Sequence, residues 1–357
     1  MIVTIKAEIF NNSKNYSDLN DLMHFFRKGK HRMNLRKSAD FIAFDRAEWT
    51  KSLSRSDIDI LRESSQAQIN KREIVISNSD NEVEFNTKEA YYYLQQNLKI
   101  ILEQEEYEKP FVLKILQEFD TTKELINSLQ EGWLEFYNGA GSNSESILRT
   151  RITKNIDTNQ NFKDPLNKYL RFYEIKDSDR EYCIINSDET ITEQKLPESK
   201  NKFLKENHIP HHILYKREKE NYMPDSVFNG LIHHNDKKEF IKSYIKLSCH
   251  QKDFLDIEKG FLKPKSNPKR IKERTNLKQE VQELYKDLSN EQYRKIGLGL
   301  PFSNFKSEFS KYFGYVTKED LEKRIKHQPK LTSKINPKEI NERNEFEHII
   351  HEIKYLL

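Results

Sequence analysis

Residues 171–179 read RFYEIKDSD, a strand-like run of apolar and aromatic side chains followed at once by Asp177 and Asp179. Two carboxylates at positions i and i+2 of an extended chain point to the same face. Their repulsion would raise one pKa or open the loop unless a cation lay between them. The stretch therefore poses a choice between a metal site at a strand end and a solvated turn, for which Asp and Ser are ordinary residues.

The segments around this stretch alternate between strand-like and helix-like patterns. Residues 98–104 (LKIILEQ), 133–139 (WLEFYNG) and 211–218 (HHILYKRE) are predicted strands, whereas residues 108–119 (EKPFVLKILQEF) carry apolar side chains at helical spacing. Such alternation predicts an α/β fold with a Rossmann-like parallel sheet flanked by helices. Ligands of these sheets bind at the carboxyl ends of the strands, which here carry Glu103, an NGAG loop, the two aspartates and KREKENY.

The 357 residues divide into three zones. Residues 1–88 are predicted to form an N-terminal α+β extension of helices and a hairpin that turns at SNSDNE, with a regulatory or docking role. Residues 89–225 form the α/β unit. Residues 226–357 are expected to be mainly helical, with Phe302, Phe305, Phe309 and Phe313 on one face as core or a dimer interface, and with a basic linker at 263–278.

Composition narrows the class of protein. The 61 basic and 57 acidic residues nearly cancel, so local patches matter more than the net charge of +4. The only two cysteines, Cys183 and Cys249, form no C-x-x-C motif, which argues against a cysteine zinc site and requires no disulfide. No stretch has the length and apolar character of a membrane span or a signal peptide, so a cytoplasmic protein without membrane contact is expected.

Histidines and basic runs offer weaker signals. His211 and His212, like His233 and His234, are adjacent pairs, and neighbours on a strand point in opposite directions, so a chelate is not expected. Residues 27–37 and the linker are candidates for neutralising a nucleic-acid backbone, although most charge runs are simply solvated.

Four motifs in one order resemble a known family. A Glu at one strand end, a glycine-bearing loop at the next and D-x-D at a third resemble the Toprim domain of topoisomerases, primases and OLD-type nucleases. R-x-x-E-N-Y-x-P at 217–224 and HQKDFLDIEKGF at 250–261 are similar to stretches of a Toprim-only family related to OLD nucleases, which includes the nuclease subunit of PARIS anti-phage systems. The resemblance spans about residues 90–262.

This resemblance implies a nuclease that cleaves DNA or RNA with one or two Mg²⁺ or Mn²⁺ ions. It also implies a toxic effector of bacterial defence, held by a partner ATPase or by its own N-terminal region, and a homodimer. The implied catalytic residues are Glu103, Asp177, Asp179, Lys216 and Glu220, and the implied metal ligands are Glu103, Asp177, Asp179, Glu218 and Glu220. Candidate phosphate or nucleic-acid contacts are Gly139, Gly141, Ser142, Arg217, Lys269, Arg270 and Lys272.

The sequence departs from the family at its first motif. The family pattern there is Glu-Gly with an Asp soon after, whereas Gln104 replaces the glycine here and Tyr107 stands near the usual acid. Either Glu105 or Glu106 substitutes, or the site binds metal less tightly. The departures keep an alternative open, a nucleic-acid or partner-binding module with a degenerate site; a primase or topoisomerase fragment is disfavoured because the chain has no zinc-binding region.

Overall fold

A computed structural model describes most of the chain. The described residues are 1–66, 70–78, 83–140, 145–150, 166–232, 237–262, 273, 276–300 and 305–357, without the side chains of residues 66, 166 and 167. Several of the residues singled out in the sequence lie outside this part of the chain: Gly141, Ser142, His233, His234, Lys269, Arg270, Lys272 and Phe302.

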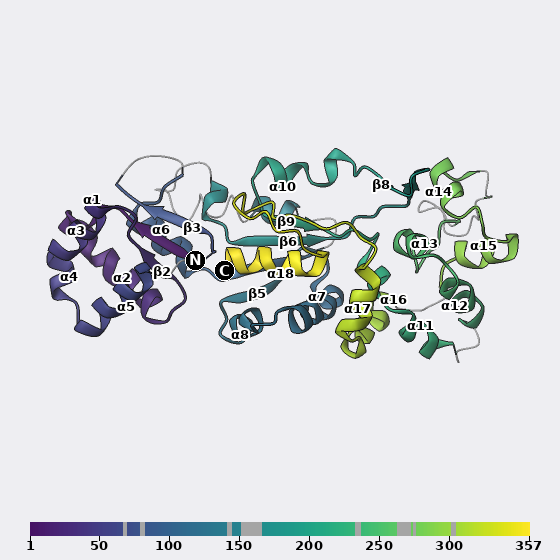
Figure 1. Cartoon of the computed structure of the whole chain (residues 1–357), viewed down its shortest axis with the longest axis horizontal. Helices are drawn as coiled ribbons and strands as arrows, with labels where there is room; N and C mark the ends of the chain where they lie inside the picture. Colours follow the sequence, from purple (N-terminus) through teal and green to yellow (C-terminus); the bar gives the residue numbers. More distant parts are fainter. Residues whose placement is uncertain are drawn as a thin grey trace.

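The molecule is elongated, with three regions in a row (Figure 1). An N-terminal unit lies at one end, a central parallel sheet in the middle and a group of helices at the other end. The last helix, α18 (Glu345–Leu356), returns along the central sheet, so the two termini lie side by side. The amino group of Met1 donates a hydrogen bond to the carbonyl of Leu357 at 2.9 Å.

The N-terminal unit contains a parallel sheet of its own. Strands β1 (Ile2–Ile5), β2 (Arg32–Asn34) and β3 (Glu73–Ile76) pair in the order β2-β1-β3, and both pairings are parallel. Its helices are α1 (Ala7–Phe10), α2 (Tyr16–Arg27), α3 (Ser38–Arg46), α4 (Glu48–Ser52), α5 (Arg55–Gln66) and α6 (Thr87–Gln95). This unit is thus a second parallel α/β unit, because helices connect each strand to the next parallel strand.

The hairpin predicted after residue 73 is wrong. Within the described residues, Phe85 pairs with Ile76 through an isolated bridge that is parallel, whereas a hairpin requires antiparallel strands. The following helix α6 begins at the N-cap Asn86, whose side chain accepts a hydrogen bond from the Glu89 backbone. Since Tyr93 and Leu94 of α6 pack in the N-terminal core, this core extends beyond residue 88.

The central sheet confirms the predicted α/β architecture of a parallel sheet flanked by helices. It comprises β4 (Leu98–Leu102), β5 (Leu134–Asn138), β6 (Phe172–Lys176) and β9 (His211–Ile213), in the order β5-β4-β6-β9 with all pairs parallel. The strands stop earlier than the sequence predicts. The polar residues at the ends of the predicted strands therefore lie in the loops at one edge of the sheet.

Side-chain alternation along β4 separates two cores. Leu98, Ile100 and Leu102 pack on the face covered by α7 (Glu105–Phe119) and α18, whereas Ile101 packs on the face covered by α10 (Lys202–Glu206) and the helical residues 145–150. Helix α8 (Glu124–Gln130) follows α7 on the first face.

The end of the molecule opposite the N-terminal unit is mainly helical. An unpredicted antiparallel hairpin, β7 (Cys183–Ile185) and β8 (Ile191–Glu193), follows the two aspartates. The helices are α11 (Asp225–Leu231), α12 (Lys238–Ile245), α13 (Cys249–Phe254), α14 (Gln279–Leu284), α15 (Asn290–Gly297), α16 (Phe305–Lys311) and α17 (Lys318–Ile325). Phe305, Phe309 and Phe313 are buried in the same core as α7, which confirms a core role for them.

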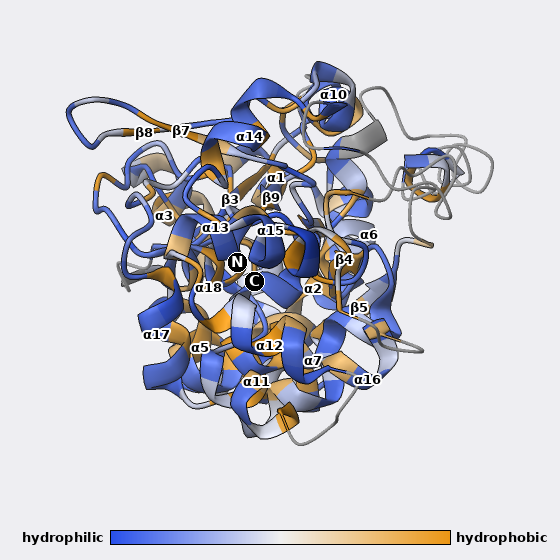
Figure 2. Ribbon diagram, turned by 90° about the vertical axis from the view of Figure 1, so that its right-hand side faces the viewer, coloured by the Kyte–Doolittle hydropathy of each residue, from blue (hydrophilic) through white to orange (hydrophobic). Residues whose placement is uncertain are grey.

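Hydropathy follows this packing (Figure 2). Hydrophilic residues dominate peripheral helices such as α17 and α10. Leu321 and Ile325 of α17 are buried. Among the described residues, no helix combines the length and the apolar character needed to cross a bilayer.

One buried carboxylate joins α18 to the central sheet. Glu345 is 1% exposed, and its Oε1 accepts a hydrogen bond from the backbone of Tyr215 at 2.7 Å and lies 2.9 Å from Nε2 of His212. Its Oε2 accepts a hydrogen bond from the Tyr222 hydroxyl at 2.5 Å. The start of α18 therefore holds the chain that follows β9.

We expect Glu345→Ala to lower the free energy of unfolding by about 3 kcal/mol, because it leaves buried donors without an acceptor. Differential scanning calorimetry should show a clear fall in Tm. Glu342→Ala removes an exposed carboxylate from the preceding segment and is the matched control, for which no change is expected. Equal Tm values for the two variants would contradict the role given to Glu345.

Candidate metal centre

Three carboxylates meet at the carboxyl edge of the central sheet. Glu103 follows β4, Asp177 follows β6, and Glu108 lies in the first turns of α7; each offers an oxygen, and these oxygens all lie within 4.8 Å of one another. β4 and β6 are adjacent, and Leu102 pairs with Ile175, so both strands end at the same level. The structure thus brings Glu103 and Asp177 together, as the sequence predicts.

Glu108 is the site residue that the sequence analysis missed. It is 6% exposed and shares the buried face of α7 with Phe111, Val112 and Ile115, and its Oε2 accepts a hydrogen bond from the Glu103 backbone at 2.9 Å. The available signal is its position three and four residues before apolar side chains of that face. A carboxylate among the apolar residues of a helix is not solvated by water, so its presence there calls for a partner inside the protein.

The two aspartates of DSD separate. β6 ends at Lys176 and Asp179 has a φ of 55°, in the left-handed region, so the alternation of an extended strand does not apply between Asp177 and Asp179. Asp177 is buried, whereas Asp179 is exposed and forms an ion pair with Lys200 at 2.5 Å. The expectation that both carboxylates share one strand face is therefore wrong.

The ammonium of Lys219 lies among the buried carboxylates. Its Nζ is 3.3 Å from Glu108 Oε1, 3.6 Å from Asp177 Oδ2 and 3.4 Å from Glu220 Oε1. The side chain is 1% exposed, so the charged ammonium group is buried away from solvent. The three carboxylates are the compensation for that burial.

Glu218 and Glu220 flank this lysine. Glu220 is 2% exposed, and its Oε2 is buried with no hydrogen-bond partner among the described residues. Glu218 is partly buried, and its backbone N–H is capped by the Asn221 side chain at 2.9 Å. The unsatisfied oxygen of Glu220 is a free acceptor inside the acidic cluster, defined here as Glu103, Glu108, Asp177, Glu218 and Glu220.

Lys216 and Arg217, which precede Glu218, form ion pairs outside the acidic cluster. Lys216 is fully buried and donates to Asp253 Oδ1 and to the carbonyl of Arg324. Arg217 is 6% exposed and pairs with Asp256 at 3.2 Å. Both predicted phosphate or transition-state contacts are therefore engaged in internal ion pairs, and neither is open to a polyanion in this structure.

Gly139 also has an internal role. It follows β5, and its N–H donates to the carbonyl of Leu102 at 2.6 Å, which extends the pairing of β5 with β4. This N–H is consequently not available to a phosphate.

A second group of possible ligands surrounds Asp253, with His250 and His327 within 4.8 Å. Asp253 already accepts hydrogen bonds from Lys216 and Arg324, and its Oδ2 lies 2.5 Å from Nε2 of His327. Burial raises the pKa of Asp253, but these cationic neighbours outweigh it and the pKa is lowered. With this much positive charge in place, the group does not fit a metal ion.

The acidic cluster behaves in the opposite way. Burial raises the pKa of Glu103 and of Asp177, and it raises the pKa of both Glu108 and Glu218 to about 8. The pKa of Lys219 is raised well above its usual value, because Asp177, Glu220 and Glu108 outweigh the effect of burial. Burial is the largest cause of each raised carboxyl pKa, and neighbouring carboxylates raise these pKa values further.

The donor set fits a hard divalent cation. Mg²⁺ and Mn²⁺ prefer carboxylate oxygens, and the residues that would hold the ion are Glu103, Glu108 and Asp177, with the free oxygen of Glu220 behind them. Asp179 lies outside this set.

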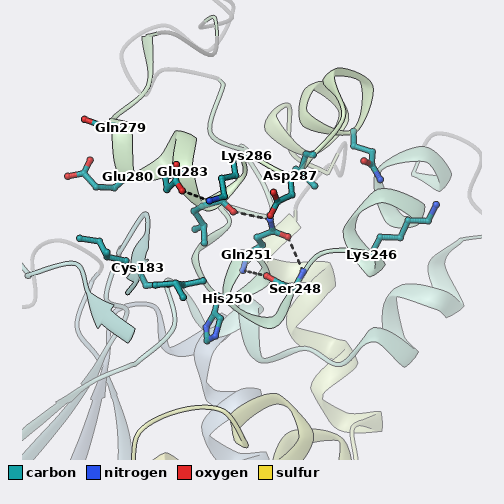
Figure 3. Close-up of a pocket in the computed structure, with 15 residues that line it drawn as sticks. Cys183, Lys246, Ser248, His250, Gln251, Gln279, Glu280, Glu283, Lys286 and Asp287 are labelled. Atoms are coloured by element: carbon teal, nitrogen blue, oxygen red, sulfur yellow. Dashed lines mark hydrogen bonds and ion pairs between the residues drawn. The ribbon is translucent and has the colours of Figure 1, made fainter. Parts of the chain in front are cut away.

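A cavity of about 840 Å³ lies apart from the acidic cluster, between β7, α13 and α14 (Figure 3). Its described lining includes Cys183, His250, Glu283 and Lys286 and none of the acidic-cluster residues. The side chains of Lys286 and Glu283 pair with each other across its wall.

Comparisons with protein-family models, with curated proteins and with solved structures find no significant match to this chain.

The raised pKa of Glu108 sets a pH dependence. A carboxyl whose folded-state pKa is raised contributes stability below its usual value of 4.5, and this contribution is lost as the pH rises to about 8. A divalent ion binds the ionised form, so we expect Mn²⁺ to raise the Tm more at pH 8 than at pH 5.5.

Thermal unfolding of the EDTA-treated protein with and without Mn²⁺ measures this difference. Glu108→Gln should reduce the Mn²⁺-induced Tm shift at pH 8, whereas Glu131→Gln, at an exposed position, should leave it unchanged. A Tm shift of the same size at both pH values would argue against proton competition at this cluster.

Proposed function

We propose that this chain is a Toprim-type nuclease that uses Mg²⁺ or Mn²⁺ to cleave phosphodiester bonds in DNA or RNA. The supporting observation is that Glu103, Glu108 and Asp177 converge at the carboxyl edge of a parallel sheet. Burial raises the pKa of Glu108 to about 8 even though the ammonium of Lys219 lies 3.3 Å from this carboxylate. That edge is where parallel sheets bind their ligands. The order of the sequence motifs supports the same assignment.

A divalent ion bound here supplies Lewis-acid stabilisation of the phosphoryl oxygens and lowers the pKa of a bound water. Glu108 and Asp177 would hold the ion from the interior, since both are buried and each accepts a backbone N–H hydrogen bond, at 2.9 and 3.1 Å.

Glu103 is proposed to hold the ion with one carboxylate oxygen and to act as general base with the other. It is partly exposed, and its carboxylate makes no hydrogen bond or ion pair with another described residue. Burial and Asp177 raise its pKa, which moves it toward the range in which a carboxylate exchanges protons efficiently near neutral pH. It is therefore placed to accept the proton of an attacking water.

Substrate contacts lie outside the buried cluster. Asp179 and Lys200 form an ion pair at the rim, and Lys176 and Lys200 act electrostatically on Glu103. Lys176 and Lys200 are partly exposed cations near Glu103, whereas Lys216, Arg217 and Lys219 are buried. The basic linker, with Lys269, Arg270 and Lys272, remains our proposed contact to the nucleic-acid backbone.

The biological setting follows from the sequence resemblance. We propose a toxic effector of an anti-phage system that acts in the cytoplasm, associates with a partner ATPase and forms a homodimer. The N-terminal α/β unit, which lies at one end of the molecule (Figure 1) and has a core of its own, is the proposed docking region for such control.

One observation favours the alternative, a binding module. The ammonium of Lys219 already lies among three carboxylates and supplies part of the charge that a metal ion would bring. Under this alternative, the protein would bind nucleic acid or a partner without cleaving it and without taking up a divalent ion.

We expect Glu103→Gln to reduce Mn²⁺-dependent cleavage by about 10²–10⁴-fold, the range for removal of a general acid–base group. Asp177→Asn should also abolish most of the cleavage, because it removes a ligand of the ion. Plasmid DNA, tRNA and total RNA incubated with purified protein provide the measurement, with EDTA as a second test of metal dependence. Glu198→Gln, at an exposed position, should retain full activity. Cleavage that survives both substitutions would refute the assignment.

A further inference from the structure

We propose that the acidic cluster takes one divalent ion, and that the ammonium of Lys219 permanently fills the position a second ion would occupy. The proposal rests on the metal-dependent function above and specifies its stoichiometry. It concerns the interior side of the cluster, where the sequence resemblance implies Glu218 and Glu220 as metal ligands.

The first argument is the geometry of the ammonium. The Nζ of Lys219 is at nearly equal distances from oxygens of Glu108, Asp177 and Glu220, between 3.3 and 3.6 Å. The ammonium of Lys219 does not form one close ion pair with a single carboxylate. It lies between three carboxylates, as a metal ion at this position would. Two-metal centres share carboxylates between ions roughly 3.5–4 Å apart, and Glu108 and Asp177 would be shared here between Lys219 and the ion at the rim.

The second argument is that Lys219 is anchored. Its backbone N–H donates a hydrogen bond to Asp177 Oδ1 at 3.1 Å, so the main chain and the ammonium of Lys219 both contact the Asp177 carboxylate. The next residue but one, Asn221, donates to the carbonyls of Lys252 and Leu255 at 2.7 and 2.8 Å. A side chain that is 1% exposed and fixed on both sides does not swing out to admit an ion.

The third argument is the distribution of free oxygens. Both oxygens of Asp177 and both of Glu108 accept contacts from Lys219 or from the backbone of Glu103. The Glu103 carboxylate, toward solvent, makes no such contact among the described residues. Glu220 Oε2 also has no hydrogen-bond partner among the described residues, but it is buried, and its companion Oε1 lies 3.4 Å from the ammonium. The partly exposed Glu103 carboxylate is therefore the solvent-side ligand for an ion, and the ammonium occupies the Glu220 side.

The experiment is a titration of the metal-free, full-length protein with Mn²⁺, followed by isothermal calorimetry and by electron paramagnetic resonance. The wild type should bind one ion per chain and give the signal of an isolated Mn²⁺. Lys219→Met, which keeps much of the side-chain volume without the charge, should bind two ions and show the broadening of a spin-coupled pair.

Lys306→Met is the matched control. Lys306 is partly buried and acts electrostatically on Asp177, but it makes no ion pair with another described residue. Removing its charge should strengthen Mn²⁺ binding and leave the stoichiometry at one, because it fills no ligand position.

Two spin-coupled ions in the wild type would overturn the proposal. A folded Lys219→Met protein that still binds only one ion would also overturn it. No Mn²⁺ binding by any of the three proteins would overturn both this inference and the metal centre. Stoichiometries of one and two without cleavage of nucleic acid would support the inference and refute only the nuclease assignment.

Discussion

Carboxylates held together away from water need a cation, and this requirement organises the carboxyl edge of the central sheet. Glu108, Asp177 and Glu220 are nearly inaccessible, and Lys219 is inaccessible with them. In such surroundings the electrostatic cost of like charges is much larger than in solvent, so each member constrains the positions of the others. The loops after β4 and β6 and the segment after β9 are held in register by this one group of charges.

A second charge centre with the opposite balance lies next to the first. Asp253 is a single carboxylate surrounded by Lys216, Arg324 and His327, and the neighbouring Asp256 pairs with Arg217. The two segments KREKENY and HQKDFLD are therefore partners in space: one supplies cations to the other's aspartates, and Asn221 binds its backbone. Their joint occurrence in the sequence has a structural reason, because removing either leaves buried charges unpaired.

The arrangement of strands could be predicted more fully than the site. Apolar runs such as LKIIL and RFYEIK are short and bounded by polar residues, so their pattern predicts buried parallel strands. The N-terminal unit was predicted less well, because β1 and β2 are short and the segment after β3 returns as a parallel bridge at Phe85. Lys216 and Arg217 were predicted to face a phosphate, yet their partners Asp253 and Asp256 lie about forty residues away, beyond the reach of local patterns.

By itself, the sequence determined the parallel α/β fold and the meeting of Glu103 with Asp177, since the carboxyl ends of adjacent parallel strands share an edge. Only the tertiary structure decided that Glu108 joins them, that Asp179 turns away in a left-handed conformation, and that Lys219 lies among the carboxylates. The physical reason is that periodicity fixes which face a side chain takes within one element. The partner of a buried charge depends instead on how separate elements pack.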